Sequence, residues 1–149
     1  MEKIRRLNGI VFEAMLRNGY NNLCNKEKEI NDLNVFPVPD GDTGTNMRLT
    51  LENGLNKAVH NEDLGQYLKN LSDGMLMGAR GNSGVILSQI FKGFSMALIR
   101  HIDATAMELV VSFIRGYRRA YDVVVRPVEG TLLTVAHEGI EKCKPQVYR

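Results

Sequence analysis

The sequence predicts an all-α protein, and three observations lead to that prediction. Apolar residues recur every three or four positions over almost the whole 149-residue chain, which is the spacing of one helix face. The strand-like run Val123–Val125 has only three residues and precedes Arg126-Pro127, which favours a helix end. Loops rich in Gly, Pro, Asp and Asn separate the helical stretches. We therefore expect about six helices, essentially no sheet, and one domain over residues 1–149.

Each expected helix follows from its own apolar stripe. In chain order the stripes are Ile4, Leu7, Val11, Ala14 and Met15; Met47, Leu51, Leu55 and Ala58; Leu64, Leu68, Leu71 and Met75; Ile86, Ile90, Phe94, Ala97 and Leu98; Ala106, Leu109, Phe113, Tyr117 and Ala120; and Leu132, Ala136, Ile140 and Cys143. Asn61 and Asp63 are expected to cap the third helix and Asp103 the fifth, because short polar side chains accept from free first-turn amides.

Composition and charge exclude several classes of protein. The formal net charge of +2, with scattered Lys and Arg, does not favour nucleic acid as a partner. No apolar run is long enough to predict a transmembrane segment, and the first residues do not resemble a secretory signal. Cys24 and Cys143 are far apart and lack metal-site spacing, which favours reduced thiols in a cytoplasmic protein.

The loop at residues 34–46 carries two carboxylates around one glycine. Pro37 and Pro39 stiffen the approach to Asp40 and Asp42. Mg²⁺ takes one or two protein carboxylates together with phosphate oxygens and water, so this pair is a candidate metal site. Small and polar residues follow where a helix start would present free amides to phosphate: Thr43, Gly44, Thr45 and Asn46.

The aspartate loop has two other interpretations. A solvated turn followed by a helix cap is what most Asp-Gly sequences form, and spacing alone leaves that alternative open. A calcium loop of the EF-hand type is excluded. If Asp40 were its first position, the required glycine would fall on Thr45 and the required glutamate on Leu51.

A second loop spaces three glycines three residues apart, directly ahead of a long apolar helix. Glycine permits tight turns and close backbone approach, and a helix N-terminus favours anions, so phosphate binding is the functional interpretation. Neither a P-loop nor a dinucleotide-binding fingerprint is present, and a packed helix–helix corner remains the alternative. The residues of this loop are Gly78, Gly81 and Gly84, with Asn82 and Ser83 between the last two.

The two loops together resemble a known family. LNVFPVPDGDTGTNM and MGARGNSGVILSQ, with the later RPVEGTLLTVA, resemble the nucleotide-binding domain of dihydroxyacetone-kinase-like proteins, and most closely the N-terminal kinase domain of bacterial fatty acid kinases. The resemblance implies an antiparallel barrel of eight α-helices that binds ATP or ADP and two Mg²⁺ ions at one open end. About six of those helices are expected here, with the rest of the family domain beyond Arg149.

The resemblance also implies roles for individual residues. Asp40 and Asp42 match the metal-binding and catalytic carboxylates, and Leu132 falls where an apolar residue faces the nucleotide. One departure is that the dihydroxyacetone branch has a third aspartate upstream, where this chain has Asn34 and Val35. Either Asn34 then supplies an amide oxygen, or nucleotide and water complete the metal shell, so the number of ions stays open. The residues matching nucleotide-binding segments are Thr43, Gly44, Thr45, Asn46, Gly81, Asn82, Ser83 and Gly84.

The implied activity is transfer of the ATP γ-phosphoryl group to a fatty acid carboxylate, giving an acyl phosphate. The resemblance implies a separate fatty-acid-binding partner protein that presents the acid, and the sequence does not exclude a homodimer. Two alternatives stay open: a dihydroxyacetone-type kinase subunit, and a non-catalytic nucleotide-binding or scaffold domain. Arg80 and Arg126, beside two of the loops, are weaker charge-stabilising candidates, and the histidines are expected at the surface or in packing roles.

Overall fold

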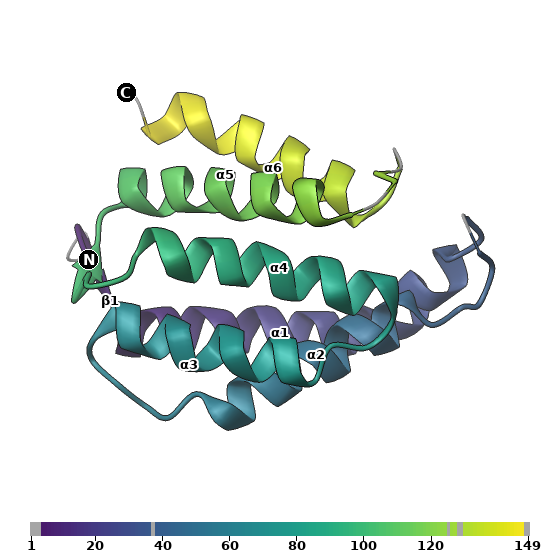
Figure 1. Cartoon of the computed structure of the whole chain (residues 1–149), viewed down its shortest axis with the longest axis horizontal. Coiled ribbons are helices and arrows are strands. Elements are labelled where there is room, and N and C mark those ends of the chain that lie inside the picture. Colours follow the sequence, from purple (N-terminus) through teal and green to yellow (C-terminus); the bar gives the residue numbers. More distant parts are fainter. Residues whose placement is uncertain (1–3, 37, 125, 128–129, 148–149) are drawn as a thin grey trace.

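The all-α prediction is confirmed. The computed structural model describes residues 4–36, 38–124, 126–127 and 130–147. Six helices and two very short strands occupy these residues (Figure 1). In chain order they are β1 (Leu7–Asn8), α1 (Gly9–Leu33), α2 (Thr43–Lys57), α3 (Leu64–Met77), α4 (Gly81–Ala97), β2 (Asp103–Ala104), α5 (Ala106–Val123) and α6 (Leu132–Val147).

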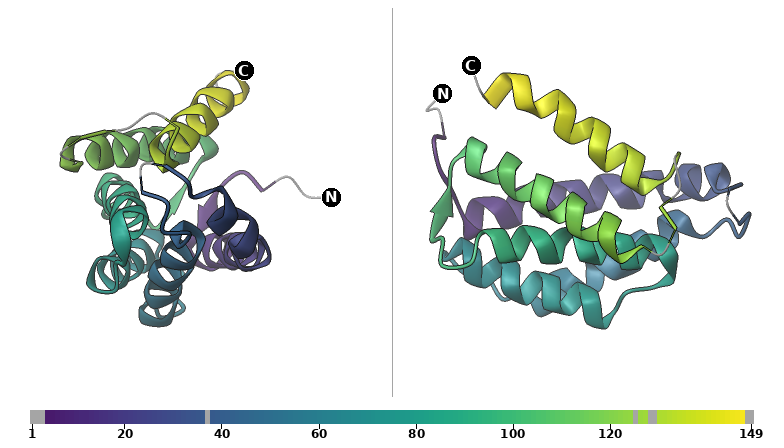
Figure 2. Two further views of the ribbon diagram at one scale, coloured as in Figure 1. Left: turned by 90° about the vertical axis from the view of Figure 1, so that its right-hand side faces the viewer. Right: turned by 45° about the horizontal axis from the view of Figure 1, so that its top comes forward.

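Successive helices run in opposite directions, so their connections gather at two ends of the molecule (Figure 1). The α1–α2 loop, the α3–α4 loop, the C-terminal end of α5 and the start of α6 lie at one end. The β1–β2 pair and the α2–α3 connection lie at the other end. Helix α6 packs mainly on α5, at the edge of the bundle (Figure 2). The aspartate loop and the glycine loop singled out in the sequence therefore lie at the same end.

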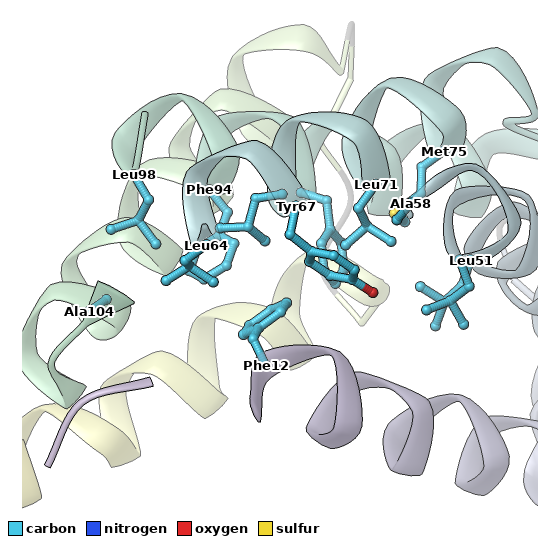
Figure 3. Close-up of a cluster of buried hydrophobic side chains, with 13 residues drawn as sticks. Phe12, Leu51, Ala58, Leu64, Tyr67, Leu71, Met75, Phe94, Leu98 and Ala104 are labelled. Atoms are coloured by element: carbon cyan, nitrogen blue, oxygen red, sulfur yellow. The ribbon is translucent and has the colours of Figure 1, made fainter. Parts of the chain in front are cut away.

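The main core forms around α3, which contributes five fully buried hydrophobic side chains (Figure 3). The ring of Phe94 stacks on Phe113, with 4.3 Å between centroids, and on Phe12, with 5.6 Å. Burying a side chain of this size contributes about 1.5–3 kcal/mol. The buried residues of this cluster are Phe12, Leu51, Leu55, Ala58, Leu64, Tyr67, Leu68, Leu71, Met75, Phe91, Phe94, Leu98 and Ala104. A smaller cluster of Ile90, Ala120 and Leu133 joins α4, α5 and α6.

The start of the first helix differs from the prediction. The helix begins at Gly9, Ile4 is exposed before it, and Leu7 pairs with Ala104 in the β1–β2 ladder. The Asn8 side chain accepts from the Val11 amide at 3.0 Å, which fixes the helix start there. The predicted face at Ala14 and Met15 is therefore wrong, because both residues point to solvent. The buried residues of this helix are Gly9, Phe12 and Glu13.

The predicted caps have mixed outcomes. Asp63 caps α3 by accepting from the Gln66 amide at 2.9 Å, as expected. Asp103 does not cap α5, because it lies in β2 and pairs with Arg6 at 2.8 Å. Thr105 caps that helix instead, in a reciprocal capping box with Glu108.

Helix α5 ends at Val123, as predicted, whereas Val125 lies outside the described residues. Within the described part of the chain, no helix is both long and apolar enough to cross a bilayer.

A buried carboxylate ties α1 to the α2–α3 connection. Glu13 is only 7% exposed, and it accepts from Arg17 Nε at 2.9 Å and lies 2.7 Å from His60 Nδ1. Burial alone would raise the pKa of Glu13, but the hydrogen bonds from His60 and Arg17 outweigh it and lower that pKa below its ordinary value of 4.5. Burial, with the Glu13 charge adding to it, raises the pKa of Tyr67 to about 12.

The hydrogen bonds of Glu13 with Arg17 and His60 predict that acid lowers the stability of the fold. Because the folded pKa is the lower one, the stability that Glu13 contributes is present above pH about 4.5 and is lost as the pH falls through the folded pKa. We expect Glu13→Gln to lower the free energy of unfolding at pH 7 by about 1–3 kcal/mol and to flatten its fall between about pH 5 and pH 3. Urea unfolding at several pH values measures both effects. An equally steep acid slope in the variant would contradict this assignment.

Candidate functional site

The aspartate loop leads directly into α2. Asp42 is the residue before the helix, and its side chain forms no cap, while Gly41 adopts a left-handed φ of 65° that glycine tolerates best. Asp40 is exposed and Asp42 half-buried. Within the described residues, neither carboxylate has a hydrogen bond or an ion pair. Two neighbouring negative charges are thus left without a protein cation to offset them.

The start of α2 is capped by α1 and not by its own aspartate. Asn34 Oδ1 accepts from the amides of Asp42 at 3.1 Å and Thr43 at 3.2 Å. Asn31 Oδ1 accepts from the Thr45 amide at 3.1 Å, and its Nδ2 donates to Thr45 Oγ1 at 2.9 Å. These first-turn amides are therefore not free for phosphate, and the Thr45 hydroxyl is bonded to α1. The sequence pattern predicted neither capping role.

The start of α4 is different, because no side chain of the described residues caps it. Gly81 opens the helix with φ 62°, and Arg80 precedes it without a capping hydrogen bond. The amides of Gly81, Asn82 and Ser83 donate to no acceptor in the part of the chain that the structure describes. Gly81 and Asn82 are exposed, so these amides form an accessible helix N-terminus. Free first-turn amides and the helix dipole together favour a bound anion such as phosphate.

The two loops converge. Ser83 Oγ, in the first turn of α4, donates to the Thr43 carbonyl oxygen in the first turn of α2 at 3.3 Å. A Cβ on Gly81 would collide with the Asn46 side chain, and one on Gly84 would collide with Thr50 Oγ1. Glycine at 84 allows this close approach of α2 and α4, and glycine at 81 is favoured both by the approach and by its left-handed φ of 62°. The aspartate loop and the glycine loop thus form one continuous surface.

Thr50 stabilises this contact by hydrogen bonding on both sides of it, and it was not among the predicted site residues. It is fully buried, its hydroxyl donates to the Asn46 carbonyl at 2.7 Å, and it accepts from the Arg80 amide at 3.1 Å. A threonine inside a helix commonly donates to the carbonyl four residues back, so the first bond has a sequence signal. The second bond joins residues 30 apart and has none.

Other predicted residues lie around this surface. Leu132 is the first residue of α6, at the same end of the bundle, and it is half-buried beside the core residue Leu133. Its contact with nucleotide stays a prediction. Arg80 is exposed. Within the described ranges, no group of three or more His, Cys, Asp and Glu side chains could hold a metal ion, so Asp40 and Asp42 form a pair without a third such ligand.

Replacing Thr50 with valine tests whether its bond to the Arg80 amide stabilises the contact between the loops. Thr50→Val keeps the side-chain shape but leaves the Arg80 amide without its acceptor, so we expect a loss of about 1–3 kcal/mol in the free energy of unfolding. The measurement is urea unfolding, read as a shift in midpoint at constant slope.

A second buried hydroxyl supplies the control for this substitution. Ser88 is also fully buried, but its hydroxyl donates to the Val85 carbonyl of its own helix at 2.7 Å. Ser88→Ala therefore removes a buried hydroxyl without taking an acceptor from the other loop, and it should lower stability by about 0.5–1 kcal/mol, less than Thr50→Val. Equal losses of stability in Thr50→Val and Ser88→Ala would contradict a stabilising role for the Thr50–Arg80 bond.

Comparison with known proteins places this geometry in a family. The model of the DAK2 domain matches residues 37–147. The chain is 47% identical over 138 residues to an uncharacterized protein of Staphylococcus haemolyticus, and 46% identical over 140 residues to one of Staphylococcus aureus strain USA300. These matches cover 91% and 93% of this chain but only 25% and 26% of the relatives, so the chain spans about a quarter of their length. The chain therefore belongs to the DAK2 domain family, which implies a nucleotide-binding role for its helical bundle.

Proposed function

We propose that this chain binds ATP with Mg²⁺ and transfers the γ-phosphoryl group to the carboxylate of a fatty acid, which a separate acyl-binding protein presents. The observation that carries the proposal is the convergence of the two loops through Ser83 and Thr43. It brings unpaired carboxylates and free amides to one surface. The fatty acid as acceptor is supported by the resemblance of the two loop sequences to bacterial fatty acid kinases.

The two helix starts divide the binding of the nucleotide between them. The free amides of Gly81, Asn82 and Ser83 suit the phosphate oxygens, which carry negative charge and accept hydrogen bonds. Asp40 and Asp42 suit Mg²⁺, because they are carboxylates that form no ion pair with a cation among the described residues. Bound Mg²⁺ would supply positive charge that offsets the charge of the phosphate oxygens.

The chemistry requires little from the protein beyond positioning and charge. In phosphoryl transfer, a carboxylate oxygen of the acid forms a bond to the γ-phosphorus while the bond to the bridging oxygen of ADP breaks. The products are ADP and the acyl phosphate. The acid is already ionised near neutral pH, so no general base has to remove a proton. The amides at the start of α4 are fixed before the reaction and can stabilise charge on the phosphoryl oxygens.

Two measurements test nucleotide binding and the identity of the phosphoryl acceptor separately. Titration calorimetry with ADP and Mg²⁺ should show one binding site, and a chain that binds no nucleotide would overturn the proposal. Transfer is tested by incubating the chain with ATP, Mg²⁺ and an oleate-loaded fatty-acid-binding protein, with hydroxylamine as a trap. An acyl phosphate yields a hydroxamate, whereas phosphorylated dihydroxyacetone does not. Hydroxamate formation supports the carboxylate acceptor, and turnover with dihydroxyacetone alone overturns it.

Substitution of the two aspartates tests the metal role. Asp40→Asn and Asp42→Asn keep side-chain size but remove the charge, so we expect each to reduce Mg²⁺-dependent ADP affinity at least about 100-fold, with helical content unchanged. Calorimetry measures the affinity and circular dichroism the helix content. Glu62→Gln is the control, since it removes one exposed carboxylate at the opposite end of the bundle. Aspartate variants that bind as tightly as this control would remove the metal role.

A further inference from the structure

We infer that Asn34 is a positioning residue that holds the aspartate loop in shape, and that it is not a metal ligand. This inference rests on the proposed function, since it concerns the same carboxylates. Asn34 follows the last residue of α1, and its amide group reaches across the bend to three backbone atoms. Its Nδ2 donates to the Val38 carbonyl at 3.0 Å, and its Oδ1 accepts from the amides of Asp42 and Thr43.

The hydrogen bonds settle which end of the Asn34 amide faces which group. An amide oxygen has two lone pairs, and here two backbone N–H groups point at it, at 3.1 and 3.2 Å. The reverse orientation would set the NH₂ group against two donors and the oxygen against the Val38 carbonyl, so it is excluded. Because both lone pairs are used, the Asn34 oxygen has none left for a cation. The sequence-based alternative of an amide ligand at Asn34 therefore does not fit this geometry.

The bend has few other means of keeping its shape. The apolar side chains of its described residues project into solvent, with Val35 71% and Phe36 59% exposed, so they make little contact with the core. The other backbone hydrogen bonds among the described residues of the bend are local, such as the one from the Asp40 amide to the Val38 carbonyl at 3.0 Å. Asn34 instead joins the entry of the bend to its exit. The two aspartates lie inside the segment that these bonds close.

A neutral amide suits this place better than a carboxylate would. Two adjacent negative charges already repel each other, and an aspartate cap at position 34 would add a third. An aspartate would also lose the donor to Val38, because an ionised carboxylate only accepts. Asn34 thus caps α2 without adding charge. The two carboxylates therefore remain available to a cation.

Hydrogen exchange without metal or nucleotide tests the positioning role directly. In Asn34→Ala, the Asp42 and Thr43 amides lose their acceptor, so we expect their exchange, followed by NMR, to quicken at least about fivefold. In Asn34→Asp, a side-chain oxygen remains, and their protection should largely return. Asn22→Ala, an exposed asparagine of the same helix, is the control and should leave both amides unchanged. Unchanged exchange in Asn34→Ala would overturn the inference, because loss of a metal ligand alone would not affect the metal-free protein.

Titration of the same variants with Mg²⁺ and ADP completes the test. We expect Asn34→Ala to weaken ADP binding at least about tenfold, because the carboxylates must be ordered at the moment of binding. Faster amide exchange with unchanged ADP affinity would show that ADP binding does not depend on Asn34. That result would overturn its positioning role. A wild-type chain that binds no ADP would overturn the proposed function instead. The exchange result separates these two failures.

Discussion

The close approach of α2 and α4 is the constraint on which the rest of the site depends. Glycine at 81 and 84 removes the side-chain atoms that would hold the two helix starts apart, and the Thr50 hydroxyl bonds to both sides of the contact. Neither loop alone combines the two features, because one has carboxylates with the amides of Asp42 and Thr43 taken and the other has free amides without acid. The convergence depends on two glycines of one loop and on a threonine that precedes this loop by about 30 residues.

Helix α1 supplies the second support, through a row of polar side chains near its C-terminal end. Glu27 pairs with Arg48 of α2 at 2.8 Å, and hydrogen bonds from Thr45 and Arg48 lower the pKa of Glu27. Asn31 and Asn34 continue the row toward the aspartate loop, spaced so that they meet the first turn of α2. The Glu27–Arg48 pair is partly exposed and is the one ion pair of this row, so it contributes little alone. Together, Glu27, Asn31 and Asn34 fix the direction in which α2 begins.

Helix periodicity predicted the fold class, the helix order and most of the core, because burial of an apolar face decides where a helix packs. Periodicity failed where a tertiary contact decided the outcome: β1–β2 pairing and the Asn8 cap moved the first helix start to Gly9, and the Arg6 pair took Asp103 away from capping. Within the site, the two loops carried local signals in their glycines and aspartates. The bonds of Asn34 to the amides of Asp42 and Thr43, and that of Thr50 to the Arg80 amide, had no signal in the sequence. Their partners become neighbours only in the folded chain.

The difference between the two helix starts follows from charge. An uncapped start presents partial positive charge, which attracts phosphate but would repel a cation. At α2, Asn31 and Asn34 accept from the amides of Asp42, Thr43 and Thr45 without adding a negative charge, so the formal charges at this helix start are those of Asp40 and Asp42. At α4 no such cap is present among the described residues, and the free amides dominate. Neighbouring helix starts of opposite character suit a ligand that itself alternates in sign, and a metal-bound polyphosphate is such a ligand.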